Sequence, residues 1–345
     1  MYLYFSILIL VFLSSFLCTA IVRKIAIRKS IIDYPNERSS HTIPTPLPGG
    51  LAIVVVWYAY LIFGYNVGLV NAKLFFALLP GILLVVIGFF DDLKGLSPYF
   101  RIVIHFIVAI SAFFILGEIN NIDLGVLVIH SNWLISILVV IGIVWWINIF
   151  NFLDGIDGYL GSEGLFIFLS FFVLVSDFSS VVMAVCILGF LIWNWPKAKI
   201  FCGDLGSTLI GYTVAVYAIY FQNTKSLSLL IPIMLCGLFW MDATVTLIRR
   251  IINREKLILP HKKNACQRLN QAGFSHKKIL LMGWVINILL FILSFASFHN
   301  MKYLPYLFLA HTIVVYTFIR YADRKKKFEN SGNTKPVRKK LFQVY

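Results

Sequence analysis

The feature that most constrains this chain is a series of apolar segments, each long enough to cross a membrane. A helix needs roughly 20 apolar residues to span about 30 Å of hydrocarbon. Segments of about that length recur along nearly the whole sequence, in which 60% of the 345 residues are hydrophobic and only 13% are charged. This composition lies far outside the range of soluble domains. We therefore predict an all-α, polytopic integral membrane protein.

Eleven spans are expected. Their approximate limits are 2–22, 50–69, 73–90, 99–117, 133–150, 160–176, 179–195, 205–222, 226–248, 279–298 and 303–320. The first segment is interpreted as a retained span because it lacks the basic n-region and the cleavage pattern of a signal peptide. The five cysteines are scattered and odd in number, so no disulfide framework is expected. We place a transmembrane domain at residues 1–322 and a basic, disordered cytosolic tail at residues 323–345.

Lys and Arg are divided very unevenly between the two sides of this topology. Of the 30 basic residues, 27 fall on the side that holds the C-terminus and the loops after the odd-numbered spans; Lys73, Lys225 and Lys302 fall on the other. Because cytosolic loops carry the excess of Lys and Arg, the N-terminus is expected outside and the C-terminus in the cytosol. Topology and contact with anionic lipid account for the formal charge of +15, so no nucleic-acid partner is expected.

Most of the other unusual polar residues fall in five loops on the cytosolic side. These loops contain NERSSHTIPTPLPGG (36–50), FFDDLKGLSPYFR (89–101), NIFNFLDGIDG (148–158), KIFCGDLGS (199–207) and LPHKKNACQRLNQAGFSHKK (259–278). An aspartate near the bilayer centre costs roughly 2.5 to 3.5 kcal/mol, so residues of this kind need a metal, a substrate, water or partners. Five such loops on one face predict an active site at the cytosolic membrane surface.

Each motif also has a purely structural interpretation. The aspartates of FFDDLKG and GDLGS could cap neighbouring helices. Asn148, Asn151 and Asp154 are spaced three residues apart and could form a hydrogen-bonded packing cluster. His261 could be an ordinary loop residue, and Asp242 could pair with a nearby arginine. Taken together, these interpretations require all the carboxylates to gather on one face by accident, so a functional site is favoured.

The residue types indicate metal-assisted phosphoryl transfer. Asp91 and Asp92 repel each other and are most easily kept charged beside a divalent cation or a basic partner such as Lys94 or Arg101. Carboxylate and amide oxygens suit Mg²⁺ or Mn²⁺, and Mg²⁺ typically takes one or two protein carboxylates together with substrate phosphates. A basic loop can hold a diphosphate as its bond breaks. The bilayer edge indicates that one substrate is a lipid, and transfer between a nucleotide-linked donor and a lipid phosphate fits all of these features.

FFDDLKG, NIFNFLDGIDG, IFCGDLGS and the histidine loop, in this order, resemble the motifs of the polyprenyl-phosphate N-acetylhexosamine-1-phosphate transferases, glycosyltransferase family 4. The resemblance covers about residues 1–320, and the first loop is most similar to the branch that initiates O-antigen or capsule synthesis. It implies Mg²⁺-dependent transfer of a HexNAc-1-phosphate from a UDP-sugar to undecaprenyl phosphate, giving UMP. It also implies a multi-pass enzyme of the bacterial inner membrane that starts a cell-surface polysaccharide, with a homodimer as one possible assembly.

The resemblance assigns roles to the residues that match its motifs. Asp204, helped by Asn151, is expected to hold the metal, and Asp91 to deprotonate or position the attacking lipid phosphate. The expected catalytic residues are Asp91, Asp92, Asp154 and His261. The expected substrate-binding residues are Asn148, Arg101 at a phosphate, Asp157 and Phe201 at uracil, and Arg268 near the diphosphate and sugar.

The sequence departs from the family pattern at four positions. Gly95 stands at a third acidic position, and Pro48 stands where a glycine is usual. Asn264 replaces the second histidine of a His-x-x-His element, and Cys266 replaces a common aromatic residue. Because sugar selection is expected in the histidine loop, these changes leave the identity of the sugar open.

Two other classes are considered as alternatives. A polytopic transporter would also be basic inside, but its substrate residues should lie near the bilayer midplane on discontinuous helices. A CDP-alcohol phosphotransferase would also use Mg²⁺ and aspartates at a membrane surface, but its aspartates should form one compact helical motif. The sequence instead distributes its carboxylates over several loops.

Overall fold

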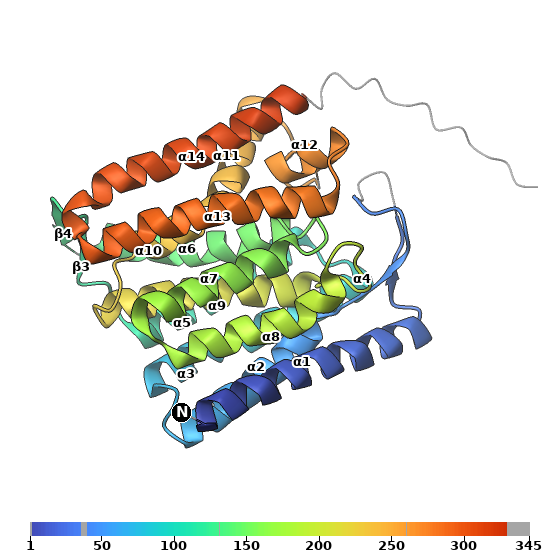
Figure 1. Cartoon of the computed structure of the whole chain (residues 1–345), viewed down its shortest axis with the longest axis horizontal. Coiled ribbons are helices and arrows are strands. Elements are labelled where there is room, and N and C mark those ends of the chain that lie inside the picture. Colours follow the sequence, from blue (N-terminus) through green and yellow to red (C-terminus); the bar gives the residue numbers. More distant parts are fainter. Residues whose placement is uncertain (1, 36–39, 131, 260, 330–345) are drawn as a thin grey trace, which may run out of the picture.

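The structure, a computed structural model, describes residues 2–35, 40–130, 132–259 and 261–329, and it is almost entirely helical (Figure 1). The helices are α1 (Tyr2–Arg28), α2 (Gly50–Asn66), α3 (Ala72–Leu78), α4 (Gly81–Lys94), α5 (Pro98–Leu116), α6 (Trp133–Phe152), α7 (Tyr159–Val175), α8 (Phe178–Asn194), α9 (Asp204–Asn223), α10 (Leu230–Leu235), α11 (Gly237–Ile252), α12 (Ala265–Gln271), α13 (His276–His299), η1 (Met301–Tyr303) and α14 (Leu304–Lys325). The strands are β1 (Ile32–Asp33), β2 (Thr45–Pro46), β3 (Asn121–Asp123) and β4 (Val128–His130). The predicted all-α membrane architecture is confirmed.

Each of the eleven expected spans coincides with one helix or with two consecutive helices. The third is divided into α3 and α4 around Pro80, and the ninth into α10 and α11 at Cys236. Within the described residues, six helical stretches are long and apolar enough to cross a membrane, and α2, α7 and α8 are shorter apolar helices. The count of eleven stays a prediction.

Helix α9 lies in the middle of the bundle and is surrounded by other helices. It contacts α2, α3, α4, α5, α6 and α7, and 16 of its 20 residues are buried. Its polar residues Ser207, Thr208 and Thr213 therefore face protein rather than lipid, where hydroxyl groups find hydrogen-bond partners. Because Asp204 is its first residue, this carboxylate is placed at the centre of one end of the bundle.

Two glycine contacts let neighbouring helices approach the start of α9 closely. A Cβ atom on Gly88 of α4 would lie 2.5 Å from the Leu205 backbone, and one on Gly206 would lie 2.7 Å from Gly50 of α2. Only glycine permits such backbone contact between helices. These contacts bring the ends of α2 and α4, with the polar loops attached to them, against Asp204.

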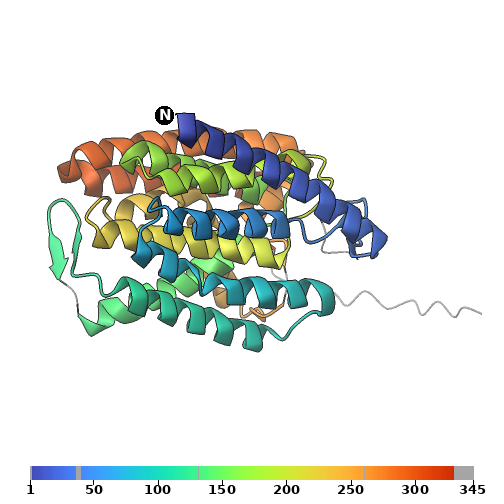
Figure 2. The same cartoon turned by 90° about the horizontal axis from the view of Figure 1, so that it is seen from below.

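A short antiparallel pair of strands lies at each end of the bundle. Strands β1 and β2 pair antiparallel, with Asp33 opposite Thr45, and hold the first polar loop at the end where Asp204 lies. Strands β3 and β4 form a second antiparallel pair at the opposite end, which projects beyond the helices in Figure 2. Thus the loops that carry the motifs gather at one end, as expected.

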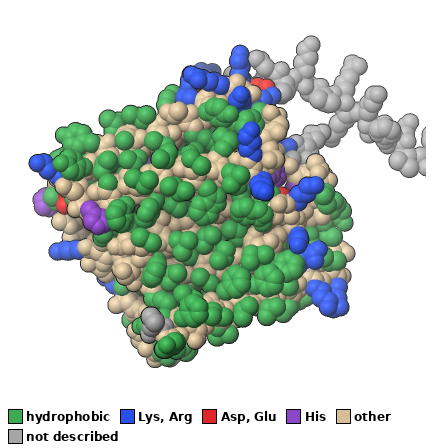
Figure 3. All heavy atoms as spheres, in the orientation of Figure 1, with side chains coloured by type: hydrophobic (Ala, Val, Ile, Leu, Met, Phe, Trp, Pro, Cys, Tyr) green, Lys and Arg blue, Asp and Glu red, His purple; other side chains and the backbone are tan. Residues whose placement is uncertain are grey.

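The surface agrees with a membrane location. Hydrophobic side chains cover the middle of the face drawn in Figure 3, whereas Lys and Arg lie toward its ends, with more of them at the end where α1 and α14 finish. Many large apolar side chains are exposed along α1, among them Phe5 and Leu10. Such contiguous apolar exposure is expected of lipid-facing helices.

The first residues of the expected tail are packed against the bundle. Asp323 lies within α14, and the Phe328 ring lies 5.4 Å from Arg249 and 5.7 Å from Arg268. Helix α14 and the residues after it thus continue past residue 322, where the tail was expected to begin. Residues 330–345, which make up most of the predicted tail, lie outside the described residues.

Candidate active site

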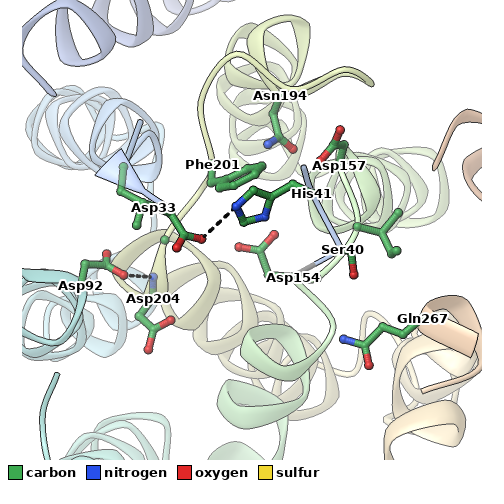
Figure 4. A pocket seen from close by; sticks show the side chains of 14 residues that line it. Asp33, Ser40, His41, Asp92, Asp154, Asp157, Asn194, Phe201, Asp204 and Gln267 are labelled. Carbon is green, nitrogen blue, oxygen red and sulfur yellow. Dashed lines mark hydrogen bonds and ion pairs between the residues drawn. The ribbon is translucent and has the colours of Figure 1, made fainter. Parts of the chain in front are cut away.

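A cavity of about 400 Å³ lies among the polar loops at the end of the bundle where α9 begins (Figure 4). Five of the predicted site residues line it: Asp92, Asp154, Asp157, Phe201 and Asp204. Its other lining residues are Asp33, Ser40, His41, Leu47, Gly155, Ile156, Asn194, Gly203 and Gln267. The loops that were expected to surround one face thus form a single polar cavity.

Backbone hydrogen bonds join the first polar loop to the loop before α9. The Phe201 N–H donates to the Pro46 carbonyl at 3.0 Å, and the Gly49 and Gly50 N–H groups donate to the carbonyls of Phe201 and Cys202 at 2.7 and 2.8 Å. These hydrogen bonds extend the backbone pairing of β1 and β2 to the residues that form the cavity wall. They hold Phe201 and the start of α9 beside the Pro- and Gly-rich loop.

Asn194, the last residue of α8, joins two further loops. Its Oδ1 accepts from the Gly158 N–H at 3.0 Å, and its Nδ2 donates to the Ile200 carbonyl at 2.9 Å. The side chain is only 3% exposed. One amide therefore fixes the end of the NIFNFLDGIDG motif relative to the IFCGDLGS motif.

Asp92 and Asp204 meet at the start of α9. The Asp204 N–H donates to Asp92 Oδ1 at 2.9 Å, which uses one of the free N–H groups at a helix N-terminus. The other oxygen of Asp92, Oδ2, is buried without a hydrogen-bond partner among the described residues. A buried carboxylate oxygen without a partner calls for a cation or a proton.

Arg101, the expected phosphate ligand, bridges three of the expected site residues. Its Nη1 contacts Asp91 and lies 3.0 Å from Asp204 Oδ2, and its Nη2 donates to Asn151 Oδ1 at 3.2 Å. Asn151 in turn donates to Ser207 Oγ at 3.1 Å. The side chains of α4, α5, α6 and α9 thus converge on one guanidinium group.

Asp91 and Lys94 are placed differently from Asp92. Both Asp91 oxygens are engaged, because Oδ1 accepts from the Leu96 N–H and Oδ2 from Arg101, and Asp91 does not line the cavity. The exposed Lys94 lies 6.0 Å from the Phe90 ring and forms no ion pair within the described residues. Gly95 ends α4 at a φ of 68°, a conformation that glycine adopts more readily than an acidic residue does.

Asp157, Phe201 and His41 form the wall opposite Asp92. Asp157 is held by the Ala198 N–H, which donates to its Oδ2 at 3.1 Å, while its own N–H donates to His276 Nδ1. The His41 ring meets Phe201 edge-on at 4.8 Å between centroids, and its Nε2 lies 3.8 Å from Asp33. Figure 4 shows His41 and Phe201 side by side at the cavity. This wall offers an aromatic face flanked by polar groups.

Negative charge is concentrated in the cavity. The carboxylates of Asp92, Asp154, Asp157 and Asp204 all line it. Loss of solvent, together with the charges of Asp204, Asp92 and Asp157, raises the pKa of Asp154 well above its usual range. This arrangement favours the binding of a cation.

The donor set fits Mg²⁺ or Mn²⁺. Asp204 and Asn151 present oxygens at one place, and the second oxygen of Asp92 lies nearby without a partner. No group of three or more His, Cys, Asp or Glu side chains in the described part of the chain is arranged to hold a metal ion. This is compatible with Mg²⁺, which takes few protein carboxylates and completes its shell with phosphates and water.

Asn148 lies one helical turn below Asn151 and does not reach the cavity. Its Nδ2 donates to the Val144 carbonyl at 2.7 Å and lies 3.2 Å from His105 Nδ1. His105 is buried, on the same face of α5 as Arg101. Asn148 therefore packs α6 against α5, as in the hydrogen-bonded packing cluster considered above. Its side chain does not face the cavity.

The histidine loop is placed beside the cavity, but its charged groups turn away from it. Arg268 is 2% exposed, and its Nη1 lies 2.5 Å from Asp323 Oδ1. His261 Nδ1 accepts from the Lys263 N–H, and burial with nearby Arg250 lowers the pKa of His261 to about 4. Neither residue lines the cavity. A pKa this low favours the neutral imidazole, so His261 adds no positive charge to the histidine loop.

Asp242 and Asn264 both fix the short helix α12. The Asp242 oxygens accept from the Ala265 N–H at 2.7 and 2.8 Å, rather than pairing with a nearby arginine as in the structural interpretation. Asn264 is 1% exposed and forms a capping box with Gln267. The departure at Asn264 thus serves the helix start, and Gln267 is the α12 residue that reaches the cavity.

Several residues of the cavity were not among those predicted from the sequence. Asp33, Ser40 and His41 lie in or next to the first polar loop, and Asn194 and Gln267 lie at helix ends. The clustering of Ser40 and His41 before a Pro- and Gly-rich stretch was a usable signal. Asn194 could have been noticed as an amide that ends an apolar run, as in the opening of the NIFNFLDGIDG motif.

Comparisons with known proteins identify the family of the chain. A sequence model of glycosyl transferase family 4 matches residues 74–222, which include the segments from α4 to α9. The chain is 30% identical over 302 residues to a probable undecaprenyl-phosphate N-acetylglucosaminyl 1-phosphate transferase of Bacillus subtilis, covering 83% of each chain. It is also similar to a decaprenyl-phosphate N-acetylglucosaminephosphotransferase of Mycolicibacterium smegmatis (30% identity, 78% and 75% covered).

A third relative is the undecaprenyl-phosphate alpha-N-acetylglucosaminyl 1-phosphate transferase of Escherichia coli K12, with 27% identity over 80% of this chain and 78% of the relative. These matches extend well beyond the motifs on which the resemblance was based. The chain therefore belongs to glycosyl transferase family 4, the polyprenyl-phosphate N-acetylhexosamine-1-phosphate transferases.

Proposed function

We propose that this protein transfers N-acetylglucosamine-1-phosphate, or a closely related N-acetylhexosamine-1-phosphate, from a UDP-sugar to undecaprenyl phosphate. The observation that carries the proposal is the carboxylate-rich cavity at one end of an apolar bundle, with Arg101 at its edge and Phe201 in its wall. The names of the relatives support the polyprenyl phosphate acceptor and the N-acetylglucosamine moiety.

The reaction exchanges one phosphoric anhydride bond for another. An oxygen of undecaprenyl phosphate attacks the phosphorus that carries the sugar, and the bond from that phosphorus to the UMP oxygen breaks. UMP leaves with the electron pair, and undecaprenyl-diphosphate-HexNAc remains in the membrane. The protein must neutralise the charge of the diphosphate and position the two phosphates in line.

The residues that line the cavity, together with Asn151 and Arg101 beside Asp204, have complementary roles in this scheme. Asp204 and Asn151 would hold Mg²⁺ or Mn²⁺, which supplies charge neutralisation for the diphosphate. Arg101 binds a phosphate from the same side. Asp92, whose second oxygen has no partner among the described residues, is better placed than Asp91 to orient the acceptor phosphate. Asp154, whose pKa is raised by burial and by the neighbouring carboxylates, would ionise more readily with a cation bound beside it.

The opposite wall would bind the nucleotide. Phe201 offers its ring to the uracil base, and Asp157 is held rigidly enough to accept hydrogen bonds from its edge. We expect the enzyme in the bacterial cytoplasmic membrane, with its N-terminus outside and this cavity in the cytosol, where UDP-sugars are made. Initiation of an O-antigen or capsule polysaccharide is the proposed pathway. A transporter is disfavoured because the cavity lies at helix ends rather than midway along the bundle.

A direct assay tests this function. The purified protein in detergent is given undecaprenyl phosphate, Mg²⁺ and a panel of UDP-sugars, and the products are identified by mass spectrometry. The expected result is UMP and undecaprenyl-diphosphate-N-acetylglucosamine, absent with EDTA or with Asp204→Asn. Release of no UMP with any UDP-sugar, by a protein that remains folded and bound to Mg²⁺, would overturn the proposal.

A further inference from the structure

Arg101 contacts the same oxygens that the proposed function gives to the metal. Its guanidinium lies 3.0 Å from Asp204 Oδ2 and 3.2 Å from Asn151 Oδ1, and it also contacts Asp91. Among the described residues, Arg101 is the only basic side chain that forms an ion pair with Asp204. A single guanidinium therefore balances much of the charge at the start of α9.

We propose that Arg101 competes with the divalent metal for Asp204 and Asn151, and that binding of the diphosphate releases it from them. The inference rests on the proposed function and adds a coupling between two ligands. The metal binds weakly to the free protein and tightly when the nucleotide is also bound. Arg101 is then a counter-ion of the free site as well as a phosphate ligand of the loaded one.

The geometry supports such an exchange. Arg101 is anchored through Asp91, whose other oxygen is fixed by the Leu96 N–H, so the guanidinium can leave Asp204 without leaving the site. The Arg101 side chain is 22% exposed, and therefore has room to turn toward a phosphate. A guanidinium group can form two parallel hydrogen bonds to a phosphate, as it does to a carboxylate. The carboxylates meanwhile keep a cation beside them in both arrangements.

The alternative is that Arg101 assists the metal by holding Asp204 and Asn151 in a ligating arrangement. The two possibilities predict opposite effects of removing the guanidinium. Competition predicts that metal binds more tightly without Arg101, whereas assistance predicts weaker binding. A metal titration without sugar donor or lipid acceptor distinguishes them, so its outcome does not depend on turnover.

The experiment measures Mn²⁺ binding by the EPR signal of free Mn²⁺, using purified wild-type protein, Arg101→Met and the control Lys94→Met. Lys94 lies at the end of the neighbouring helix α4, is exposed and carries the same charge, so it corrects for the general loss of a positive charge. We expect Arg101→Met to bind Mn²⁺ at least tenfold more tightly than wild type, and Lys94→Met to bind as wild type does. Equal or weaker binding by Arg101→Met, or an equal gain in Lys94→Met, would overturn the competition.

A second titration tests the release by nucleotide. Added UDP should tighten Mn²⁺ binding to wild type by a larger factor than to Arg101→Met, after correction for Mn²⁺ bound by UDP in solution. An equal factor in both proteins would contradict the release. If Arg101→Met does not fold, Arg101→Lys replaces it, because an ammonium group keeps the charge but cannot contact three side chains at once. Tighter Mn²⁺ binding by Arg101→Lys supports competition, and unchanged or weaker binding refutes it.

Discussion

Asn194→Leu tests how strongly one buried amide holds the cavity together. Leucine has a similar size but cannot accept from the Gly158 N–H or donate to the Ile200 carbonyl, which Asn194 contacts at 3.0 and 2.9 Å. A buried backbone group left without a partner costs about 1 to 3 kcal/mol. Two such groups give roughly 2 to 6 kcal/mol, and we expect the lower half of this range because both loops border a polar cavity that admits water.

The effect should appear in stability and in substrate binding together. In detergent, Asn194→Leu should lower the free energy of unfolding by about 2 to 4 kcal/mol. It should also raise KM for the UDP-sugar, because the two loops carry Asp157 and Phe201. Asn66→Leu is the matched control, since Asn66 is exposed at the end of α2 and donates to the Ile62 carbonyl within its own helix. An Asn194→Leu protein with the stability of Asn66→Leu and an unchanged KM would refute the reasoning.

Three further substitutions test individual roles. Asp204→Asn should lower kcat by roughly two orders of magnitude or more with the fold retained in circular dichroism, since it removes the charge that holds the metal; near-normal turnover at ordinary Mg²⁺ would contradict the assignment. Phe201→Ala should raise KM for the UDP-sugar by a factor corresponding to about 1 to 3 kcal/mol, the range of base stacking. If Phe201 only packs, steady-state kinetics will show an unchanged KM and thermal unfolding a lower midpoint. Asn264→His should lower the free energy of unfolding by about 1 kcal/mol, and with it the thermal midpoint, because it disrupts the capping box of α12. An unchanged midpoint together with a changed sugar preference would indicate instead that Asn264 contributes to sugar binding.

The position of the site could be predicted from the sequence because its cause is topological. Loops that follow odd-numbered spans must lie on one side of the membrane, so FFDDLKG, NIFNFLDGIDG and IFCGDLGS had to share one face. The apolar segments predicted the helices, with ends that differ from the observed ones by up to about six residues, and Pro80 within an apolar run accounts for the division between α3 and α4. Which motif residues face a common cavity was the next inference, and it succeeded for Asp92, Asp154, Asp157 and Asp204.

The placement of the basic loop could not be predicted because it depends on a distant carboxylate. Arg268 pairs with Asp323, 55 residues away in the sequence, and Arg249 binds the same carboxylate through two hydrogen bonds at 2.8 and 2.9 Å. Nine basic residues between Arg249 and Lys278 suggested a surplus of charge for a diphosphate. The sequence does not show that α14 packs against this loop and that its Asp323 pairs with two of these basic residues.

The same contacts explain how a helix outside the cavity contributes to it. Asp323 of α14 holds Arg268 on α12, and Asp242 of α11 holds the first N–H of α12. Helix α12 has only two turns, too few to be stable in isolation, so these contacts must maintain it. Because Gln267 lies on α12 and lines the cavity, the ion pair beneath the loop stabilises a wall of the site. The basic loop therefore acts on the cavity through the position of Gln267, while Arg101 on α5 supplies positive charge to the carboxylates directly.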